Sequence, residues 1–254
     1  MQSSIIIESW QATLERDGYA WLPEVLTGSQ VAAVRDSWHR HRERAQRDSQ
    51  SHNGSLLQRD SGELYGARNL LRDWPEGIAL TLQPQLVQAV REILGPQAGL
   101  VRGLFFDKPP GSSWALPWHQ DRTIAVQSNA EPPPGFSKPT HKAGIPHLEA
   151  PQPVLSQMLT ARIHLDAMAG DNGPLQVIPG SHCSSASEFL HAGPMRELAC
   201  AEGAVLLMRP LLGHASRNAL PETTRHRRIV HLEFAASPTQ IAPLAWADWR
   251  ELAG

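Results

Sequence analysis

A chain of 254 residues, 41% hydrophobic and 19% charged, is long enough for one large all-β or α+β domain and has the composition of a soluble globular protein. Its formal net charge of −2 argues against a basic surface that binds nucleic acid or an anionic membrane. The two cysteines, Cys183 and Cys200, form no CxxC pair, and the apolar run at residues 5–7 is too short for a signal peptide or a membrane span. We therefore expect a soluble, cytoplasmic protein with neither a nucleic-acid nor a membrane partner.

The N-terminal part of the chain predicts two amphipathic helices. Apolar residues recur at helical spacing over residues 31–38, and Thr27 or Ser29 stands in front of them as a candidate N-cap. The pattern returns over residues 86–94, where Gly95, followed by a proline, predicts the end of the helix.

From about residue 100 the chain changes to short β-like runs separated by proline and glycine. The predicted strands cover residues 100–106, 119–126, 158–166, 175–178, 204–208 and 227–235. This pattern predicts a mainly β (α+β) protein with one domain: mostly helical support over 1–98, a double-stranded β-helix (jelly-roll, cupin-like) core over 99–236, and a tail over 237–254. The proline-rich residues 127–153 are long for a connection and predict a lid or a binding loop.

A histidine and an aspartate two residues apart are the first candidates for metal binding. On a strand, His119 and Asp121 would point to the same face and present an imidazole beside a carboxylate. Two histidines and one carboxylate on one face of an octahedral ion leave three positions open, which suits Fe(II) that must bind a chelating cosubstrate and O₂. The second histidine must come from another strand. His214 follows a predicted strand, and Gly213 before it would let the backbone approach the ion closely.

A second pair with the same spacing competes for this role. His164 and Asp166 lie in a predicted strand whose other face is apolar, so they also share one side. The residues alone leave both pairs open as metal ligands.

Several ordered motifs resemble those of the phytanoyl-CoA dioxygenase family, whose relatives include ectoine hydroxylase and bacterial natural-product oxygenases. The matching segments are Asp107-Lys108-Pro109-Pro110, Trp118-His119-Gln120-Asp121, Asn172-Gly173-Pro174-Leu175-Gln176-Val177-Ile178-Pro179-Gly180-Ser181-His182, His214-Ala215-Ser216 and Arg227-Arg228-Ile229. The resemblance covers roughly residues 18–235. It implies that His119, Asp121 and His214 bind Fe(II), and that His164 lies on a strand that borders the pocket.

The resemblance also implies that the cosubstrate is 2-oxoglutarate, whose distal carboxylate an arginine binds with its planar fork. Counting back seven residues from an aromatic, Phe234, selects Arg227, whereas the family's shorter interval after the histidine selects Arg225, and Arg228 is the third choice.

Two more residues follow from matching positions. Ser216 corresponds to a position that contacts 2-oxoglutarate. Arg162 stands near a position usually held by an aromatic residue, so we expect it to contact either the cosubstrate or the substrate.

The activity that the resemblance implies is hydroxylation of an unactivated C–H bond of a small molecule, with O₂ and 2-oxoglutarate consumed and succinate and CO₂ released. Related halogenases replace the carboxylate ligand with a small residue, so Asp121 favours hydroxylation, with desaturation or cyclisation as other outcomes. Candidates for contact with the substrate are Trp114, Arg122, His147 and Arg217. The alternative is a non-redox metal-binding cupin, either an isomerase or a small-molecule binding protein, and a third interpretation is a catalytically silent jelly-roll module.

Overall fold

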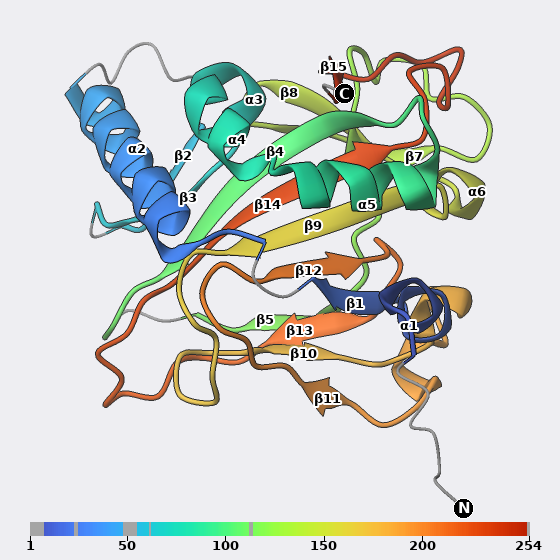
Figure 1. The fold of residues 1–254 in the computed structure, drawn as a ribbon. Coiled ribbons are helices and arrows are strands. Elements are labelled where there is room, and N and C mark those ends of the chain that lie inside the picture. The colour runs from blue at the N-terminus through green and yellow to red at the C-terminus, as the bar shows by residue number, and fades with distance from the viewer. Residues whose placement is uncertain (1–7, 23–24, 48–54, 61, 112–113, 253–254) are drawn as a thin grey trace, which may run out of the picture.

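The longest strands of the chain form one eight-stranded antiparallel sheet in the computed structural model, which describes residues 8–22, 25–47, 55–60, 62–111 and 114–252 (Figure 1). The strand order is β1-β12-β9-β14-β4-β3-β2, and β15 pairs with β4. The strands are β1 (Tyr19–Leu22), β2 (Leu56–Gln58), β3 (Leu64–Ala67), β4 (Gly99–Lys108), β9 (Met158–His164), β12 (Val205–Met208), β14 (Arg227–Ala235) and β15 (Arg250–Glu251).

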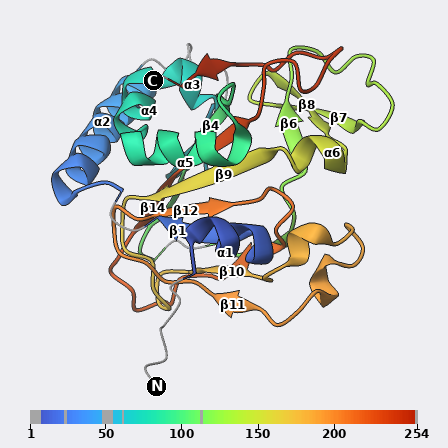
Figure 2. The same ribbon diagram turned by 45° about the vertical axis from the view of Figure 1, so that its right-hand side comes forward.

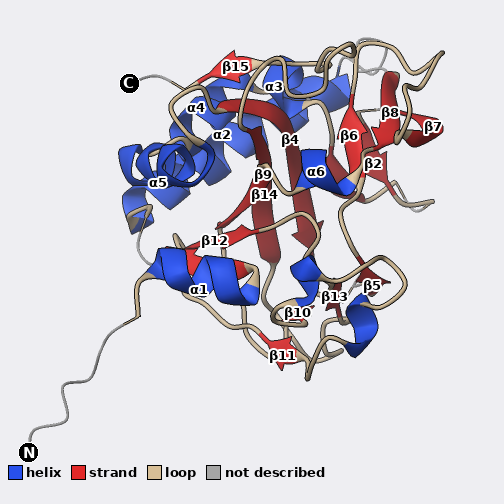
Figure 3. Cartoon of the chain, turned by 90° about the vertical axis from the view of Figure 1, so that its right-hand side faces the viewer, coloured by secondary structure: helices blue, strands red, loops and turns tan. Residues whose placement is uncertain are grey.

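A second antiparallel sheet has four strands in the order β11-β10-β13-β5. Its strands are β5 (Leu116–His119), β10 (Leu175–Val177), β11 (Arg196–Glu197) and β13 (His214–Ser216). Figure 1 shows this sheet below the large one, and Figure 3 shows it from the side. The predicted strands at 100–106, 158–166, 175–178, 204–208 and 227–235 are confirmed, with small shifts at their ends.

The segment predicted to be a long irregular connection contains ordered strands. β6 (Thr123–Ala125), β8 (Ile145–Glu149) and β7 (Ser137–Lys142) form a three-stranded antiparallel sheet, which Figure 2 shows beside α6 (Gln152–Leu155). The irregular loop expected over residues 127–153 is therefore wrong as a description of its structure. A lid function for the same segment stays a prediction.

Helices cover one face of the large sheet (Figure 1). They are α1 (Trp10–Asp17), α2 (Gly28–Arg47), α3 (Leu70–Asp73), α4 (Pro75–Thr81) and α5 (Pro84–Leu94), with 3₁₀ turns at η1 (Ser181–Cys183) and η2 (Phe189–His191). Thr27 Oγ accepts a hydrogen bond from the Gln30 amide at 3.3 Å, and Gly95 ends α5 at a positive φ of 91°, so both predicted helix boundaries are confirmed. In the part of the chain that is described, no helix has the length and apolar character that a membrane span requires.

The division of the chain into a helical part and a β part is less strict than the sequence predicts. Besides its helices, the segment over residues 1–98 contributes β1, β2 and β3 to the large sheet, and the predicted tail over 237–254 returns as β15. Local patterns miss β1 and β15 because the strands that pair with them, β12 and β4, are distant in the sequence.

β14 separates the hydrophobic core from the site. Val230, Leu232 and Phe234 are fully buried and belong to the core cluster that also contains residues from the covering helices. Each such side chain contributes roughly 1.5–3 kcal/mol by its removal from water. Because side chains alternate along a strand, Arg227, His231 and Glu233 point to the opposite face, where they line a cavity.

Candidate metal centre and cavity

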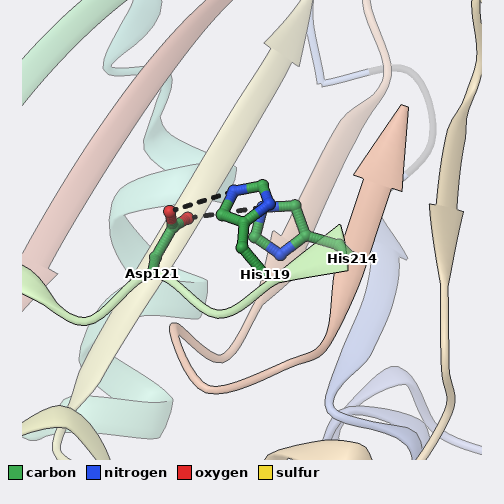
Figure 4. Close-up of side chains that lie close together, drawn as sticks. All are labelled: His119, Asp121 and His214. Carbon is green, nitrogen blue, oxygen red and sulfur yellow. Dashed lines mark ion pairs between the residues drawn. The ribbon is translucent and has the colours of Figure 1, made fainter. Parts of the chain in front are cut away.

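Three side chains converge on one point, two from the neighbouring strands β5 and β13 of the four-stranded sheet and one from the segment that follows β5 (Figure 4). The ligand atoms of His119, Asp121 and His214 all lie within 4.8 Å of one another. His119 Nε2 is 3.7 Å from Asp121 Oδ1, and His214 Nε2 is 3.6 Å from Asp121 Oδ2. His119 at the end of β5 pairs with His214 at the start of β13, so the sheet register itself brings the two imidazoles together.

Both imidazoles are oriented by backbone carbonyls two residues before them. His119 Nδ1 lies 2.8 Å from the Pro117 oxygen, and His214 Nδ1 lies 2.9 Å from the Leu212 oxygen. A proton on Nδ1 donates to the carbonyl and leaves the Nε2 lone pair facing Asp121. The buried Oδ2 atom of Asp121 accepts no hydrogen bond from any described residue. Two imidazole nitrogens and one carboxylate in this arrangement fit a metal with open coordination positions.

The charges around these groups favour the protonation states that metal binding requires. Burial lowers the pKa of His214 to about 4, although the charge of Asp121 opposes this shift. Burial by itself raises the pKa of Asp121, but His214, His231 and His119 lower it more, to about 2. At neutral pH the His214 imidazole is therefore neutral and the Asp121 carboxylate ionised, as ligands to a cation must be.

The reason that His119 and Asp121 lie together differs from the predicted one. The expected strand over 119–126 is interrupted, because β5 ends at His119 and β6 begins at Thr123. Asp121 lies in the break, where its amide donates to the Pro210 oxygen at 2.9 Å. A hydrogen bond to the segment before His214 therefore positions Asp121, and the alternation of side chains along a strand does not.

Gly213 is also tightly packed, and its expected role in letting the backbone approach an ion stays a prediction. A Cβ atom at this position would lie 2.3 Å from Phe189 Cδ2, and the Gly213 amide donates to Ser181 Oγ at 2.8 Å. Close packing against the η1–η2 segment requires the glycine.

The competing pair does not form a comparable group. Asp166 accepts hydrogen bonds from Arg228, at 2.7 and 2.8 Å to the side chain, and from Arg35 at 3.0 Å. His164 is fully buried, and its ring lies 5.6 Å from that of Trp21. Burial first, and then the charges of two arginines, hold the pKa of His164 well below its usual value, so this imidazole is neutral.

The metal centre opens on a cavity of about 760 Å³ between the two larger sheets. The residues that line it are Leu57, Gln58, Arg59, Asp60, Tyr65, Arg68, Arg102, Leu104, Phe106, Trp114, Leu116, His119, Asp121, Thr123, Lys142, Arg162, Leu175, His214, Ser216, Arg227, His231 and Glu233. A volume of this size is typical of a site for a small molecule.

Paired positions on β4 and β14 set the order of side chains along one wall of this cavity. The register pairs are Lys108 with Arg227, Phe106 with Ile229, Leu104 with His231 and Arg102 with Glu233. On the other side of β14, Arg162 of β9 is level with His231. The wall therefore has cations at both of its ends.

At one end, the guanidinium of Arg227 lies beside the amine of Lys108. Arg227 is 3% exposed, and its Nε and Nη1 atoms contact no hydrogen-bonding partner among the residues described. Lys108 donates to Ser216 Oγ at 2.9 Å and to the Arg217 oxygen at 2.7 Å. Burial, followed by the charges of Arg227 and Arg162, lowers the pKa of Lys108 to about 6. Three of these groups, Arg227, Arg162 and Ser216, are the ones predicted to contact the cosubstrate.

The other arginines considered for the cosubstrate are bound elsewhere. Arg225 is half exposed and forms an ion pair with Asp171. Arg228 pairs with Asp166 at 2.7 Å, and neither arginine lines the described part of the cavity.

Of the four residues expected to contact a substrate, one lines the described part of the cavity and three do not. Trp114 lines the cavity, 5.9 Å from the ring of Tyr65. Arg122, His147 and Arg217 are absent from the described lining. Arg122 donates to Gln120 at 3.3 Å, His147 is buried in the three-stranded sheet, and Arg217 forms an ion pair with Glu197 at 2.5 Å.

Several polar residues of the site were not among the predicted ones. Lys108, Arg102, His231 and Glu233 lie in or beside the cavity. The alternation of side chains along β14 carries a signal for two of them, because His231 and Glu233 share the face of Arg227. Lys108 and Arg102 depend on the β4–β14 register.

Comparison with known proteins agrees with this architecture. A family model described as phytanoyl-CoA dioxygenase (PhyH) matches residues 14–228. AviO1 from Streptomyces viridochromogenes Tue57 is 21% identical, with 89% of this chain and 95% of that chain covered and a TM-score of 0.63. EctD from S. alaskensis, crystallised with 2-oxoglutarate and 5-hydroxyectoine, is 18% identical, with 94% and 80% covered and a TM-score of 0.68.

A third solved structure has the same fold. The carbocyclase SnoK from nogalamycin biosynthesis, described as non-heme and alpha-ketoglutarate dependent, is 15% identical, with 90% of this chain and 84% of that chain covered and a TM-score of 0.63. No curated protein sequence matches the chain. These likenesses confirm the predicted jelly-roll fold.

Proposed function

Because the chain belongs to the phytanoyl-CoA dioxygenase (PhyH) family, we propose that it is an Fe(II)- and 2-oxoglutarate-dependent dioxygenase that hydroxylates an unactivated C–H bond of a small molecule. One observation carries the proposal. The three convergent ligand groups of His119, Asp121 and His214 share one cavity with the buried guanidinium of Arg227. We place this activity in the cytoplasm, in line with the two free cysteines, Cys183 and Cys200.

In this proposal, His119 Nε2, His214 Nε2 and the Asp121 carboxylate would hold Fe(II). Bound iron supplies the coupling of O₂ reduction to the conversion of 2-oxoglutarate into succinate and CO₂. The backbone carbonyls that bind Nδ1 of each histidine keep the imidazoles in one orientation. Asp121 keeps a ligand position occupied by a carboxylate, which favours hydroxylation.

Arg227 is assigned to the distal carboxylate of 2-oxoglutarate. A buried guanidinium with unsatisfied N–H groups is costly, and a carboxylate that accepts two of these hydrogen bonds removes the cost. Lys108 adds a second donor at the same end, and Ser216, which accepts a hydrogen bond from Lys108, holds that amine in place. Arg162, level with His231 on the neighbouring strand, lies between this end and the centre of the wall.

The proteins of similar structure are described with different outcomes of their reactions. EctD was crystallised with a hydroxylated compound, whereas SnoK is described as a carbocyclase. We assign hydroxylation to this chain, and analysis of the product would distinguish it from desaturation or ring formation.

Anaerobic titration tests the proposal directly. Addition of Fe(II) and then 2-oxoglutarate should give a metal-to-ligand charge-transfer absorption band that saturates at one equivalent, together with a higher melting temperature. If iron binds but 2-oxoglutarate produces neither the band nor stabilisation, the protein is a non-redox metal-binding cupin, and the oxygenase proposal fails.

A further inference from the structure

The cavity contains more positive than negative groups. Among the described residues, six arginine and lysine side chains line it, against the three carboxylates of Asp60, Asp121 and Glu233. One of the six, Arg59, is paired with Glu63 at 3.3 Å. Asp121 belongs to the metal centre, and Asp60 is exposed and forms no ion pair with the described cations. Within the described lining, Glu233 is therefore the one buried carboxylate that is left to balance the unpaired cations distant from the metal.

Two of these cations meet at Thr123, far along the wall from Arg227. Arg102 Nη1 donates to the Thr123 backbone oxygen at 3.3 Å, and Lys142 Nζ donates to the Thr123 hydroxyl at 3.1 Å. Arg102 also forms an ion pair with Glu233 at 3.1 Å. The carboxylate of Glu233 thus compensates Arg102, and Lys142 has no acidic partner in the described part of the chain.

Arg68 adds a third cation to this group. It follows β3 and lines the same cavity, and its guanidinium makes no hydrogen bond or ion pair with any other described residue. Burial first, and then the charge of Arg102, lower the pKa of Arg68. Burial, and then Arg102 and Arg68, lower the pKa of Lys142. The three cations are therefore close enough to repel one another, and a bound anion would relieve this repulsion.

Apolar side chains connect this cationic group with the metal centre. On β4, Leu104 and Phe106 follow Arg102 at steps of two residues, so all three side chains share the cavity face. Trp114 lies against Phe106, with ring centroids 6.2 Å apart, and against Tyr65. His231, which is level with Leu104, lies one step, or about 7 Å of strand, from Glu233.

We propose that the cavity binds its substrate as an organic anion, with a carboxylate or phosphate group on Arg68, Arg102 and Lys142 and an apolar body along Leu104 and Phe106. The cationic end at Arg227 then holds the cosubstrate, and the opposite cationic end holds the substrate. That the apolar body is the part presented for oxidation rests on the proposed function, whereas the anion site itself does not.

The test uses three small probes of similar size: phenyl phosphate, phenylacetate and the neutral 2-phenylethanol. Calorimetric affinities are measured at constant ionic strength, for the isolated protein and for the protein loaded anaerobically with Fe(II) and 2-oxoglutarate. Both anions should bind at least tenfold more tightly than the alcohol, and the tighter of the two identifies phosphate or carboxylate as the preferred group.

Matched variants locate the binding. Arg68→Gln and Lys142→Gln should each weaken anion binding about tenfold, since one charge-assisted hydrogen bond is lost, while 2-phenylethanol is unaffected. Arg225→Gln, which removes a half-exposed cation paired with Asp171 outside the cavity, should change nothing. An unchanged melting temperature shows that each variant is folded.

Two results would overturn the inference: equal binding of the alcohol and the anions, or anion binding that Arg227→Ala abolishes and Arg68→Gln leaves intact. If the wild-type protein binds neither Fe(II) nor 2-oxoglutarate but phenyl phosphate still depends on Arg68, the proposed oxygenase function fails and the anion site stands.

Discussion

Lys108 and Arg227 lie directly opposite each other on β4 and β14, so a lysine amine and a guanidinium meet at one buried end of the cavity. Like charges on opposed strands destabilise a sheet unless something compensates them. Ser216 and the Arg217 carbonyl oxygen accept hydrogen bonds from the lysine, but they carry no negative charge. An anion bound between them would favour the protonated form of the lysine, and the first predictions concern these two residues.

The arginine of the pair is expected to determine affinity for 2-oxoglutarate. Arg227→Ala should weaken binding roughly tenfold to several hundredfold, because a charge-assisted hydrogen bond is worth about 1.5–3 kcal/mol. Arg227→Lys should recover part of the loss, since a point charge cannot supply the planar fork. The measurement is titration of the charge-transfer band. Arg225→Ala is the control, and a large loss there with none at Arg227 would reassign the cosubstrate arginine.

The lysine of the pair should make stability depend on pH. Burial lowers the pKa of Lys108 from 10.5 to about 6, so between these values the unfolded chain binds more protons than the folded one. Stability of the ligand-free protein should therefore rise with pH across this window, by up to about 1.4 kcal/mol per pH unit from this group. Below pH 6 both states are protonated and the cost of the buried ammonium is fully present.

Lys108→Met removes the titrating group and should flatten this dependence. Urea denaturation at several pH values measures it, and Lys138→Met, at an exposed lysine, is the control. An equal pH dependence in wild type and Lys108→Met would show that burial does not lower the pKa of Lys108 in the folded protein.

Removal of either histidine of the metal centre should remove the iron. His119→Ala or His214→Ala should lower iron content sharply and abolish turnover, because each leaves the ion with two protein ligands. His164→Ala should retain iron, since that imidazole lies beside Trp21 and its aspartate neighbour pairs with arginines. Metal analysis of the purified variants decides. Iron lost in His164→Ala and kept in His119→Ala would mean that the other pair binds the metal.

The sequence could identify the candidate ligand residues because their types and order are local. His119 and Asp121 are two residues apart, and the motif around them resembles one family. The cause of their convergence was not visible, since Asp121 is placed by a hydrogen bond to Pro210, a residue far along the chain. The convergence of these residues was thus predicted from strand alternation that the chain does not use at Asp121.

The positions of the cavity cations could not be predicted from the sequence, for a different reason. Arg102 and Glu233 are 131 residues apart, and they meet because β4 and β14 pair in one register. A shift by one residue would turn every side chain of β4 to the other face, so the pairing cannot be read from either strand alone. Lys142 depends on a hairpin in a segment whose proline content suggested an irregular loop.

That hairpin, β7 and β8, gives a prediction about motion. Asn69 Nδ2 donates to the Ala143 oxygen in its turn at 3.0 Å, which fastens the hairpin beside α3. Asn69→Ala should speed hydrogen exchange in residues 137–149, because this contact holds the tip. In the wild type, substrate binding should slow exchange there, if the hairpin acts as a lid that carries Lys142. Uniform strong protection without ligand, in wild type and variant alike, would rule out a lid.

Two explanations can account for the glycine at position 213, the residue before His214. Sequence considerations attribute it to close approach of the backbone to the ion, whereas the structure shows that a Cβ atom would lie 2.3 Å from Phe189 Cδ2 and 3.1 Å from Ser181 Oγ. Gly213→Ala should therefore overpack this contact and cost about 1–3 kcal/mol, lowering the melting temperature by about 2–4 °C for each kcal/mol. Displacement of His214 should also weaken iron binding.

Adding Phe189→Leu makes room for the new methyl group, and the double variant should regain much of both losses relative to Gly213→Ala. If stability returns in the double variant while iron affinity does not, the glycine is needed at the ion itself and the packing explanation is wrong.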